Sequence, residues 1–271
     1  MGTAQTERSP ATEDRNGYQL VGDGARKVIV LHGWLSDAAS WGPVAQAADR
    51  SVFTWCFMDA RGYGLSRERR GAYTMDEIAQ DTLAVADSLG WQEFALVGHS
   101  MTGLAVQRAL LAAPERVSAL VGVTPVPASG GGLAGERRAL FDQAVEDYGA
   151  RATVIDRSTG SRRGDRWVRD LTERSFASSE TEAVRGYLDS WADGDFHAEI
   201  RGNTVPVGVI AGAHDPSLSA RRMTDTWLAW YPDSCLEVLE DSGHYPMDEQ
   251  PGPLTYAIQK VLVNHAAGPG T

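Results

Sequence analysis

The feature that most constrains the fold is a repeated alternation of short apolar runs with longer helical patterns. Near-continuous apolar runs are typical of strands that are buried on both faces of a sheet. Strands and helices in regular succession predict an α/β fold with a mostly parallel, doubly wound sheet. We therefore expect strands at 27–31, 52–58, 94–97, 117–123, 205–211 and 235–239, and helices at 40–49, 74–89, 101–113, 218–231 and 252–266.

One long stretch interrupts this alternation. Residues 128–203 open with Ala-Ser-Gly-Gly-Gly, contain no convincing strand and have a polar, helical pattern. Because the alternation resumes at Val205, we expect a helical cap at 128–203, inserted into a core formed by 17–127 and 204–266. The polar start, residues 1–16, is predicted to be a disordered tail.

Charge and composition exclude several classes of protein. The chain has 25 Lys and Arg against 36 Asp and Glu, a net charge of −11, which argues against nucleic acid as a partner because phosphates bind to a basic field. No apolar run approaches the roughly 18 residues of a membrane-spanning helix, and residues 1–17 lack the apolar region of a secretory signal. Cys56 and Cys235 lie in apolar runs and are expected to be buried free thiols. These features predict a cytoplasmic protein and leave open whether it forms a homo-oligomer.

The strongest chemical signal is Leu96-Val-Gly-His-Ser-Met-Thr-Gly103, where a buried strand ends and a helix begins around Ser100. A nucleophile elbow needs this arrangement, because its strained turn lifts the serine hydroxyl above the sheet at a helix N-terminus. Gly98 supplies the small residue required before the serine. Thr102 replaces the usual glycine after it, so the helix must tilt or the Thr102 hydroxyl must bond locally. An ordinary N-cap serine is the alternative.

A serine nucleophile needs a base, and the base needs an acid to orient it. His244 follows the last strand in Asp241-Ser-Gly-His-Tyr-Pro-Met247, and Asp215 follows the strand at 205–211 in Gly212-Ala-His-Asp-Pro216. Both positions should lie at the same sheet edge as Ser100. The alternatives are a structural histidine and a turn aspartate. The chain order Ser100, Asp215, His244 predicts a catalytic triad of the order that one hydrolase fold uses.

The segment His32-Gly33-Trp34 ends the first strong strand and suggests an oxyanion hole. Acyl transfer places negative charge on a carbonyl oxygen, which preorganised backbone N–H groups stabilise by about 3–4 kcal/mol for each donor. The N–H groups of Met101 and Trp34 are the expected donors. A tight turn at Gly33 without a catalytic role is the alternative.

Five motifs, HGW, DARGYGLS, GHSMTG, GAHD and DSGHYPMDEQP, appear in this order, and together they resemble the α/β-hydrolase superfamily over roughly residues 18–265. The resemblance is closest to small bacterial aryl esterases, enol-lactonases and cofactor-free haloperoxidases or perhydrolases. It implies Ser100 as nucleophile, Asp215 as acid, His244 as base, and Trp34 and Met101 as oxyanion donors. Thr102 departs from the family motif and puts the local shape of the pocket in doubt.

Substrate contacts are expected from Trp34 and Met101, from the cap aromatics Trp167 and Trp191, and from Tyr245 beside the base. Residues 156–174 carry six arginines against four acidic residues. We expect a solvated face there, with recognition of an anionic substrate group as the alternative.

The predicted function is a serine hydrolase that cleaves a small-molecule ester or lactone through an acyl-enzyme. Ligand spacings typical of metal sites are absent from the sequence, and neither a metal nor a cofactor is expected. Two alternatives stay open. One is carbon–carbon bond hydrolysis, lyase chemistry or cofactor-free oxygenation on the same fold with His244 as the base. The other is a non-catalytic, ligand-sensing receptor.

Overall fold

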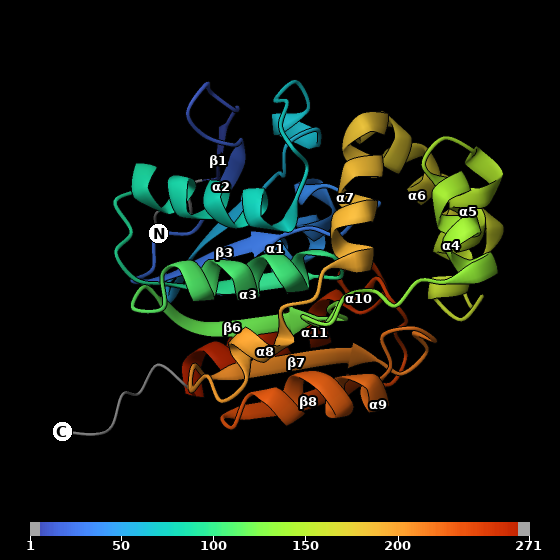
Figure 1. The fold of residues 1–271 in the computed structure, drawn as a ribbon. Coiled ribbons are helices and arrows are strands. Elements are labelled where there is room, and N and C mark those ends of the chain that lie inside the picture. The colour runs from blue at the N-terminus through green and yellow to red at the C-terminus, as the bar shows by residue number, and fades with distance from the viewer. Residues whose placement is uncertain (1–5, 265–271) are drawn as a thin grey trace.

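The computed structural model describes residues 6–264, and within them an eight-stranded sheet forms the centre of the molecule (Figure 1). The strand order is β1-β2-β4-β3-β5-β6-β7-β8. Strand β2 pairs antiparallel with both β1 and β4, and all the other pairs are parallel. The strands are β1 Thr6–Ser9, β2 Tyr18–Val21, β3 Arg26–Leu31, β4 Phe53–Met58, β5 Phe94–His99, β6 Val117–Val123, β7 Val207–Gly212 and β8 Ser234–Leu239. The predicted mostly parallel α/β sheet is confirmed.

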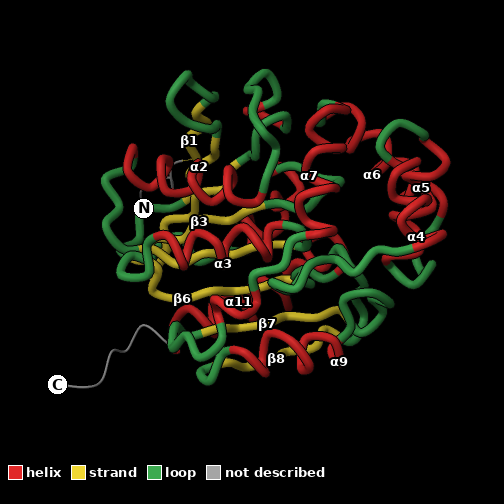
Figure 2. Tube along the Cα trace, viewed as in Figure 1, coloured by secondary structure: helices red, strands yellow, loops and turns green. Residues whose placement is uncertain are grey.

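Helices cover both faces of this sheet, as the tube in Figure 2 shows. Helices α2 and α3 pack together on one face, and α1 and α11 pack together on the other. The helices of the core are α1 Gly42–Ala47, α2 Met75–Ser88, α3 Thr102–Ala112, α9 Ala220–Met223, α10 Pro246–Glu249 and α11 Pro251–Asn264, with short 3₁₀ turns at Ala38–Trp41 and Gly64–Ser66 and a π-helical turn at Thr224–Leu228. The buried faces of these helices and of the strands form one continuous apolar core.

Between β6 and β7 the described chain forms five helices and, at Ser179, one isolated β-bridge to Tyr63. The helices are α4 Gly135–Ala144, α5 Tyr148–Ser158, α6 Asp165–Ser178, α7 Thr181–Asp193 and α8 His197–Ile200. Helices α4, α5 and α6 gather beyond the end of the sheet toward which β7 points (Figure 1). They therefore lie over the carboxyl ends of the parallel strands, the edge at which α/β folds bind their ligands.

The N-terminal segment differs from its prediction. Residues 1–5 lie outside the described residues, but Thr6–Ser9 pair with Tyr18–Val21 as an edge strand, and Arg15 donates a 2.7 Å hydrogen bond to Ser9 Oγ. The prediction of a disordered tail over 1–16 is therefore wrong from residue 6 onward. Since most of β1 is exposed, backbone pairing rather than an apolar pattern stabilises it, and the sequence carries no hydrophobic signal for such a strand.

The two cysteines are unpaired, and only one of them is buried. Cys56 lies inside β4 and is fully buried, whereas Cys235 is exposed on the edge strand β8. The prediction of a buried Cys235 is wrong because an outer strand of a sheet lacks a neighbour on one side. In the part of the chain that the structure describes, no helix is both long and apolar enough to cross a bilayer.

Candidate active site

Ser100 occupies the sharp turn between β5 and α3. Its φ of +55° lies in the left-handed region that non-glycine residues avoid, so this turn stores strain. The turn is fixed by two backbone hydrogen bonds: Ser100 N donates to Val123 O at 3.1 Å, and Val126 N donates to Ser100 O at 2.9 Å. A Cβ at Gly98 would lie 2.6 Å from the Thr102 carbonyl oxygen. The glycine before the serine is therefore required by close approach of the helix to the strand.

The structure brings Ser100, His244 and Asp215 together in one hydrogen-bonded chain. His244 Nε2 lies 2.9 Å from Ser100 Oγ, and His244 Nδ1 lies 2.6 Å from Asp215 Oδ2. Asp215 is 2% exposed. Its other oxygen, Oδ1, accepts hydrogen bonds from the backbone N–H groups of Ser217 and Leu218 at 2.8 and 2.9 Å. Because both carboxylate oxygens are occupied, Asp215 can present only Oδ2 to the imidazole.

Sheet topology explains how residues so far apart in the sequence meet. Strands β5, β6, β7 and β8 pair in parallel, so their carboxyl ends lie along one edge. Ser100 directly follows β5, Asp215 follows β7 and His244 follows β8. The loops cross closely here, and a Cβ at Gly212 would lie only 2.0 Å from the Gly243 carbonyl oxygen. Small residues at the ends of both strands therefore let the base and its acid approach each other.

The backbone of His244 is held from several sides. Its carbonyl oxygen accepts hydrogen bonds from His99 Nε2 at 2.8 Å and from Thr124 Oγ1 at 3.2 Å, and its N–H donates to Ser158 O in the cap at 3.2 Å. The Glu249 carboxylate accepts from the N–H groups of the residues on either side of His244. The imidazole is thus positioned by its main chain as well as by Asp215.

His99 lies directly beneath the base and is fully buried. Its ring centroid is 5.0 Å from that of His244, and a Cβ at Gly33 would lie 2.5 Å from His99 Nδ1. Burial, followed by repulsion from His244, lowers the pKa of His99 well below its usual value. His99 is therefore neutral at physiological pH, with the proton on Nε2, which donates to the His244 carbonyl.

Thr102, the departure from the family motif, is accommodated by its own hydroxyl. The hydroxyl donates to the carbonyl oxygens of His99 at 3.0 Å and Leu31 at 3.3 Å, and the side chain is 1% exposed. The backbone position that requires a glycine is the next one, Gly103, where a Cβ would lie 2.6 Å from Pro125 Cβ. The β-branched residue therefore bonds locally and leaves the turn at Ser100 in place.

Of the two expected oxyanion donors, Met101 directly follows Ser100 in the chain, and Trp34 lines the same pocket as Ser100. Within the described residues, the backbone N–H groups of Trp34 and Met101 have no hydrogen-bond acceptor outside regular helices and strands. The carbonyl of Trp34 accepts from Tyr63 Oη at 2.8 Å, and its indole donates to Val184 O in α7 at 2.7 Å. Trp34 therefore joins the core to the cap while its N–H stays free.

A pocket lies between the cap and the sheet edge, and Ser100, Asp215 and His244 are among the residues that line it. Of the expected substrate contacts, Trp34, Trp191 and Tyr245 line it. Met101 is fully buried and Trp167 packs edge-on against Tyr245 with centroids 5.8 Å apart, so neither side chain lines the pocket. The lining of this pocket does not support contact of Met101 or Trp167 with substrate, and that contact stays a prediction.

The pocket also contains residues that the sequence analysis did not single out as binding groups. They include the apolar Leu35, Val126, Val154 and Leu218 and the cations Arg137 and Arg222. Phe141 of the cap also lines the pocket and stacks on Trp34, with ring centroids 5.4 Å apart. No arginine of residues 156–174 lines this pocket. The six-arginine segment therefore does not supply the charge at the site.

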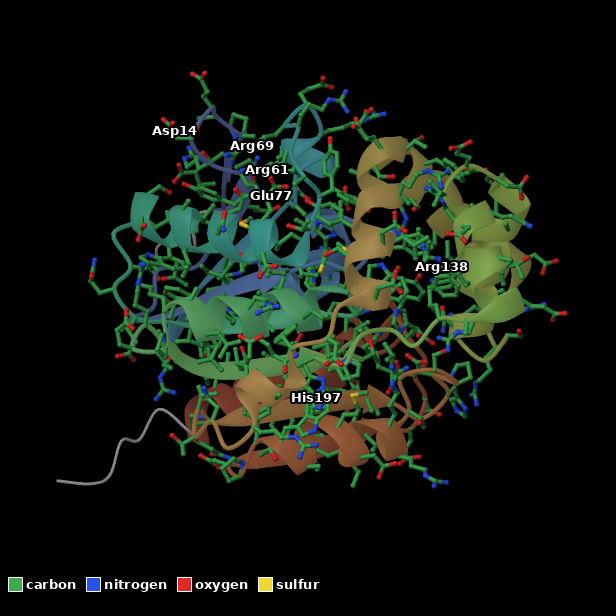
Figure 3. The ribbon with its side chains drawn as sticks, viewed as in Figure 1. Asp14, Arg61, Arg69, Glu77, Arg138 and His197 are labelled. Atoms are coloured by element: carbon green, nitrogen blue, oxygen red, sulfur yellow. The ribbon has the colours of Figure 1, made fainter. Side chains whose placement is uncertain are left out.

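The segment Asp59–Ser66 forms a network of hydrogen bonds and ion pairs in the core. Asp59 accepts hydrogen bonds from the N–H groups of Ala38 and Leu65, and burial raises its pKa to about 7. Arg61 pairs with Asp81 at 2.8 Å and Glu77 at 3.0 Å, and Figure 3 shows Arg61 and Glu77 near each other.

Over residues 6–264, no group of three or more His, Cys, Asp or Glu side chains is arranged to hold a metal ion.

Comparison with known proteins gives a consistent result. The sequence profile of the alpha/beta hydrolase fold family matches residues 27–251. A pimeloyl-[acyl-carrier protein] methyl ester esterase from Serratia marcescens is 25% identical over 261 residues, covering 92% of this chain and 98% of its own. A 3-oxoadipate enol-lactonase 2 from Acinetobacter baylyi is 25% identical over 249 residues, covering 90% and 92%. The structure of a hydrolase from Oleispira antarctica superposes with a TM-score of 0.82 at 19% identity, covering 93% and 96%.

Proposed function

Because the chain belongs to the α/β-hydrolase fold family, we propose that it is a serine hydrolase that cleaves a carboxylic ester or lactone of a small organic substrate through an acyl-enzyme intermediate. The observation that carries the proposal is the hydrogen-bonded chain from Ser100 Oγ through His244 to Asp215. Hydrolysis of an ester bond is supported by the family match and by relatives named as a methyl ester esterase and an enol-lactonase.

Acylation begins with proton transfer from Ser100 to His244. Nε2 takes the hydroxyl proton across 2.9 Å while Oγ forms a bond to the carbonyl carbon. Asp215 keeps the proton of the neutral imidazole on Nδ1 and stabilises the imidazolium that forms. The tetrahedral intermediate then breaks the bond to the alkoxide, which takes the proton from His244 Nε2. An ester loses its alcohol at this step, and a lactone keeps it as a tethered hydroxyl.

The N–H groups of Trp34 and Met101 are the proposed donors to the oxyanion. Two donors aimed at the developing charge would lower the barrier by roughly 3–4 kcal/mol each. The position of Met101 directly after the nucleophile supports its role, because the elbow fixes this N–H relative to Ser100 Oγ. The side-chain hydrogen bonds of Trp34 and Tyr63 support the role of Trp34, since they hold its main chain in place.

Deacylation repeats the same proton transfers with water as the nucleophile. His244 Nε2 takes a proton from water, the hydroxide oxygen attacks the acyl carbon, and the second tetrahedral intermediate releases Ser100, which regains its proton from His244. The product is a carboxylic acid and the enzyme is regenerated. The pocket favours a small substrate with an apolar body, because carbon-rich side chains from the cap and the core form much of its lining.

The test compares Ser100→Ala and His244→Ala with the wild type on a panel of p-nitrophenyl esters and on γ- and δ-lactones. The proposal predicts that both variants lose at least three orders of magnitude in kcat on every substrate that the wild type cleaves. Unchanged turnover by Ser100→Ala would remove the serine from the mechanism. Loss in the His244 variant alone would favour lyase, carbon–carbon hydrolase or oxygenase chemistry, with the histidine as the base.

A further inference from the structure

Two pairs of neighbouring arginines lie near the pocket. In each pair one arginine lines the pocket, and the other forms ion pairs with carboxylates outside it. On α4, Arg138 forms ion pairs with Asp142, Asp189 and Asp193. Figure 3 shows Arg138 on the cap, facing α7. Its neighbour Arg137 lines the pocket instead and makes no ion pair with a described residue.

The second pair lies on α9, where Arg221 is 92% exposed and pairs with Asp225 at 3.7 Å. Its neighbour Arg222 turns inward and lines the pocket. Arg222 is fixed there by backbone carbonyls: Nη2 donates to Gly130 O at 2.9 Å and to Gly131 O at 3.1 Å. Carbonyl oxygens satisfy donors of the guanidinium without neutralising its charge. In the described chain no carboxylate forms an ion pair with Arg222.

Arg137 and Arg222 are close enough to affect each other. Burial lowers the pKa of Arg222, and repulsion from Arg137 lowers it further. Partial desolvation also lowers the pKa of Arg137, although Arg137 is an exposed residue at the rim of the pocket. Two like charges side by side cost free energy in the unliganded protein. An arrangement of this kind is typical of a site that an anion completes.

The negative groups near these arginines do not complete the site. Asp215 attracts both guanidinium groups, but its oxygens are bound to His244 and to the N–H groups of Ser217 and Leu218. The other carboxylate is Glu136, which is exposed in an adjoining outer groove that Arg137 also lines. The pocket wall therefore carries two cations against one carboxylate that the triad already uses.

We propose that Arg137 and Arg222 form a subsite for a carboxylate, so that the substrate of this enzyme is an ester or lactone that carries a second, free carboxyl group. The inference rests on the proposed hydrolysis at Ser100. Arg222 is the fixed donor, since the loop at Gly130 and Gly131 holds it. Arg137 is the second donor; its guanidinium lies 5.8 Å from the Phe141 ring centroid and forms no ion pair with a described residue. Bidentate guanidinium–carboxylate hydrogen bonds give this subsite its selectivity over a neutral group of the same size.

The test uses matched substrates that differ only in charge. One series comprises p-nitrophenyl half-esters of dicarboxylic acids from succinic to suberic acid, each paired with its terminal carboxamide. A second pair, 4-acetoxybenzoate and 4-acetoxybenzamide, places the charge on the leaving side. The proposal predicts that the wild type has a kcat/KM about tenfold or more higher for the carboxylate member of at least one pair, and that this ratio falls as salt is added.

Arg137→Gln and Arg222→Gln should each reduce that ratio by about tenfold, mainly by lowering kcat/KM for the charged substrate. Arg138→Gln and Arg221→Gln remove the same charge from the adjacent residue outside the pocket and should leave the ratio unchanged. Arg137→Gln is the more secure variant, because the Arg137 side chain makes no hydrogen bond on which the described fold depends. Equal ratios in the wild type and all four variants would overturn the proposal.

A binding measurement separates this proposal from the proposed catalysis. Isothermal titration of Ser100→Ala with adipate, and with adipamide as the neutral counterpart, reports the subsite without turnover. Binding of adipate that Arg137→Gln abolishes supports the subsite even if no ester is cleaved, which would contradict only the proposed function. Cleavage of neutral esters, together with equal or no binding of the two titrants, would support the hydrolase and refute the subsite.

Discussion

Replacing Asp215 with asparagine removes one charge from the triad and keeps its shape. The amide must place its oxygen toward the backbone N–H groups of Ser217 and Leu218, which lie 2.8 and 2.9 Å from Oδ1. Its NH₂ group then faces His244 Nδ1, where Asp215 Oδ2 now lies at 2.6 Å. An NH₂ donor requires an acceptor at Nδ1, so the imidazole proton moves to Nε2. That nitrogen can then no longer accept the proton of Ser100.

The expected loss in kcat is about 10⁴-fold, the effect of the same exchange in serine proteases, which corresponds to about 5 kcal/mol of transition-state stabilisation. The backbone hydrogen bonds remain, so the melting temperature should fall by only a few degrees. Steady-state hydrolysis of a p-nitrophenyl ester measures the first quantity, and thermal unfolding measures the second.

Asp241→Asn is the matched control, because Asp241 is an exposed carboxylate in the loop that carries His244 and does not contact the base. It should keep activity within twofold of the wild type. A folded Asp215→Asn variant with kcat within tenfold of the wild type would refute the reasoning, since the imidazole would then not need this carboxylate to select its tautomer.

Three further predictions follow from packing and charge around the elbow. Thr102→Gly removes the buried hydrogen bonds of the Thr102 hydroxyl and should lower the free energy of unfolding in urea by about 1–2 kcal/mol. Its kcat should stay within about threefold of the wild-type value. A hundredfold loss in kcat would show that Thr102 shapes the site directly. Gly212→Ala places a Cβ 2.0 Å from Gly243 O and should reduce kcat and the melting temperature together, and a fully active variant would contradict the close approach. His99 is neutral in the folded protein but protonates below about pH 6.5 in the unfolded chain, so its contribution to the free energy of unfolding falls by about 1 kcal/mol between pH 7 and 5.5. His99→Gln keeps the donor to the His244 carbonyl, and its free energy of unfolding should decline less over that pH range. An equal decline in the variant and the wild type would refute the assignment of a neutral His99.

The meeting of Ser100, Asp215 and His244 could be predicted because each follows an apolar run that a parallel sheet buries. Ser100, Asp215 and His244 all lie where a strand ends, and parallel pairing requires those ends to share one edge. The pattern of apolar runs therefore specifies the fold and the location of the reacting groups together. Local hydrogen bonding by the Thr102 hydroxyl could also be predicted, since a β-branched residue at this crowded position must either tilt the helix or bond to nearby backbone.

Features that depend on which way a cap side chain turns could not be predicted. Arg137 and Arg138 are neighbours of the same type in sequence, yet one lines the pocket and the other pairs with carboxylates of the cap. Arg222 and Arg137 line the same pocket because the fold brings α9 and α4 to its wall, and no periodicity in the sequence encodes that arrangement. The edge strand at Thr6–Ser9 was missed for a related reason, since backbone pairing stabilises it without an apolar pattern.

The most direct measurement of the central claim is covalent labelling with a fluorophosphonate, which reacts with a serine that a neighbouring histidine activates. The account predicts stoichiometric addition to the wild type, located on Ser100 by peptide mass spectrometry, and no addition to Ser100→Ala or His244→Ala. An unlabelled wild-type protein that is correctly folded, or a label on a serine other than Ser100, would contradict it.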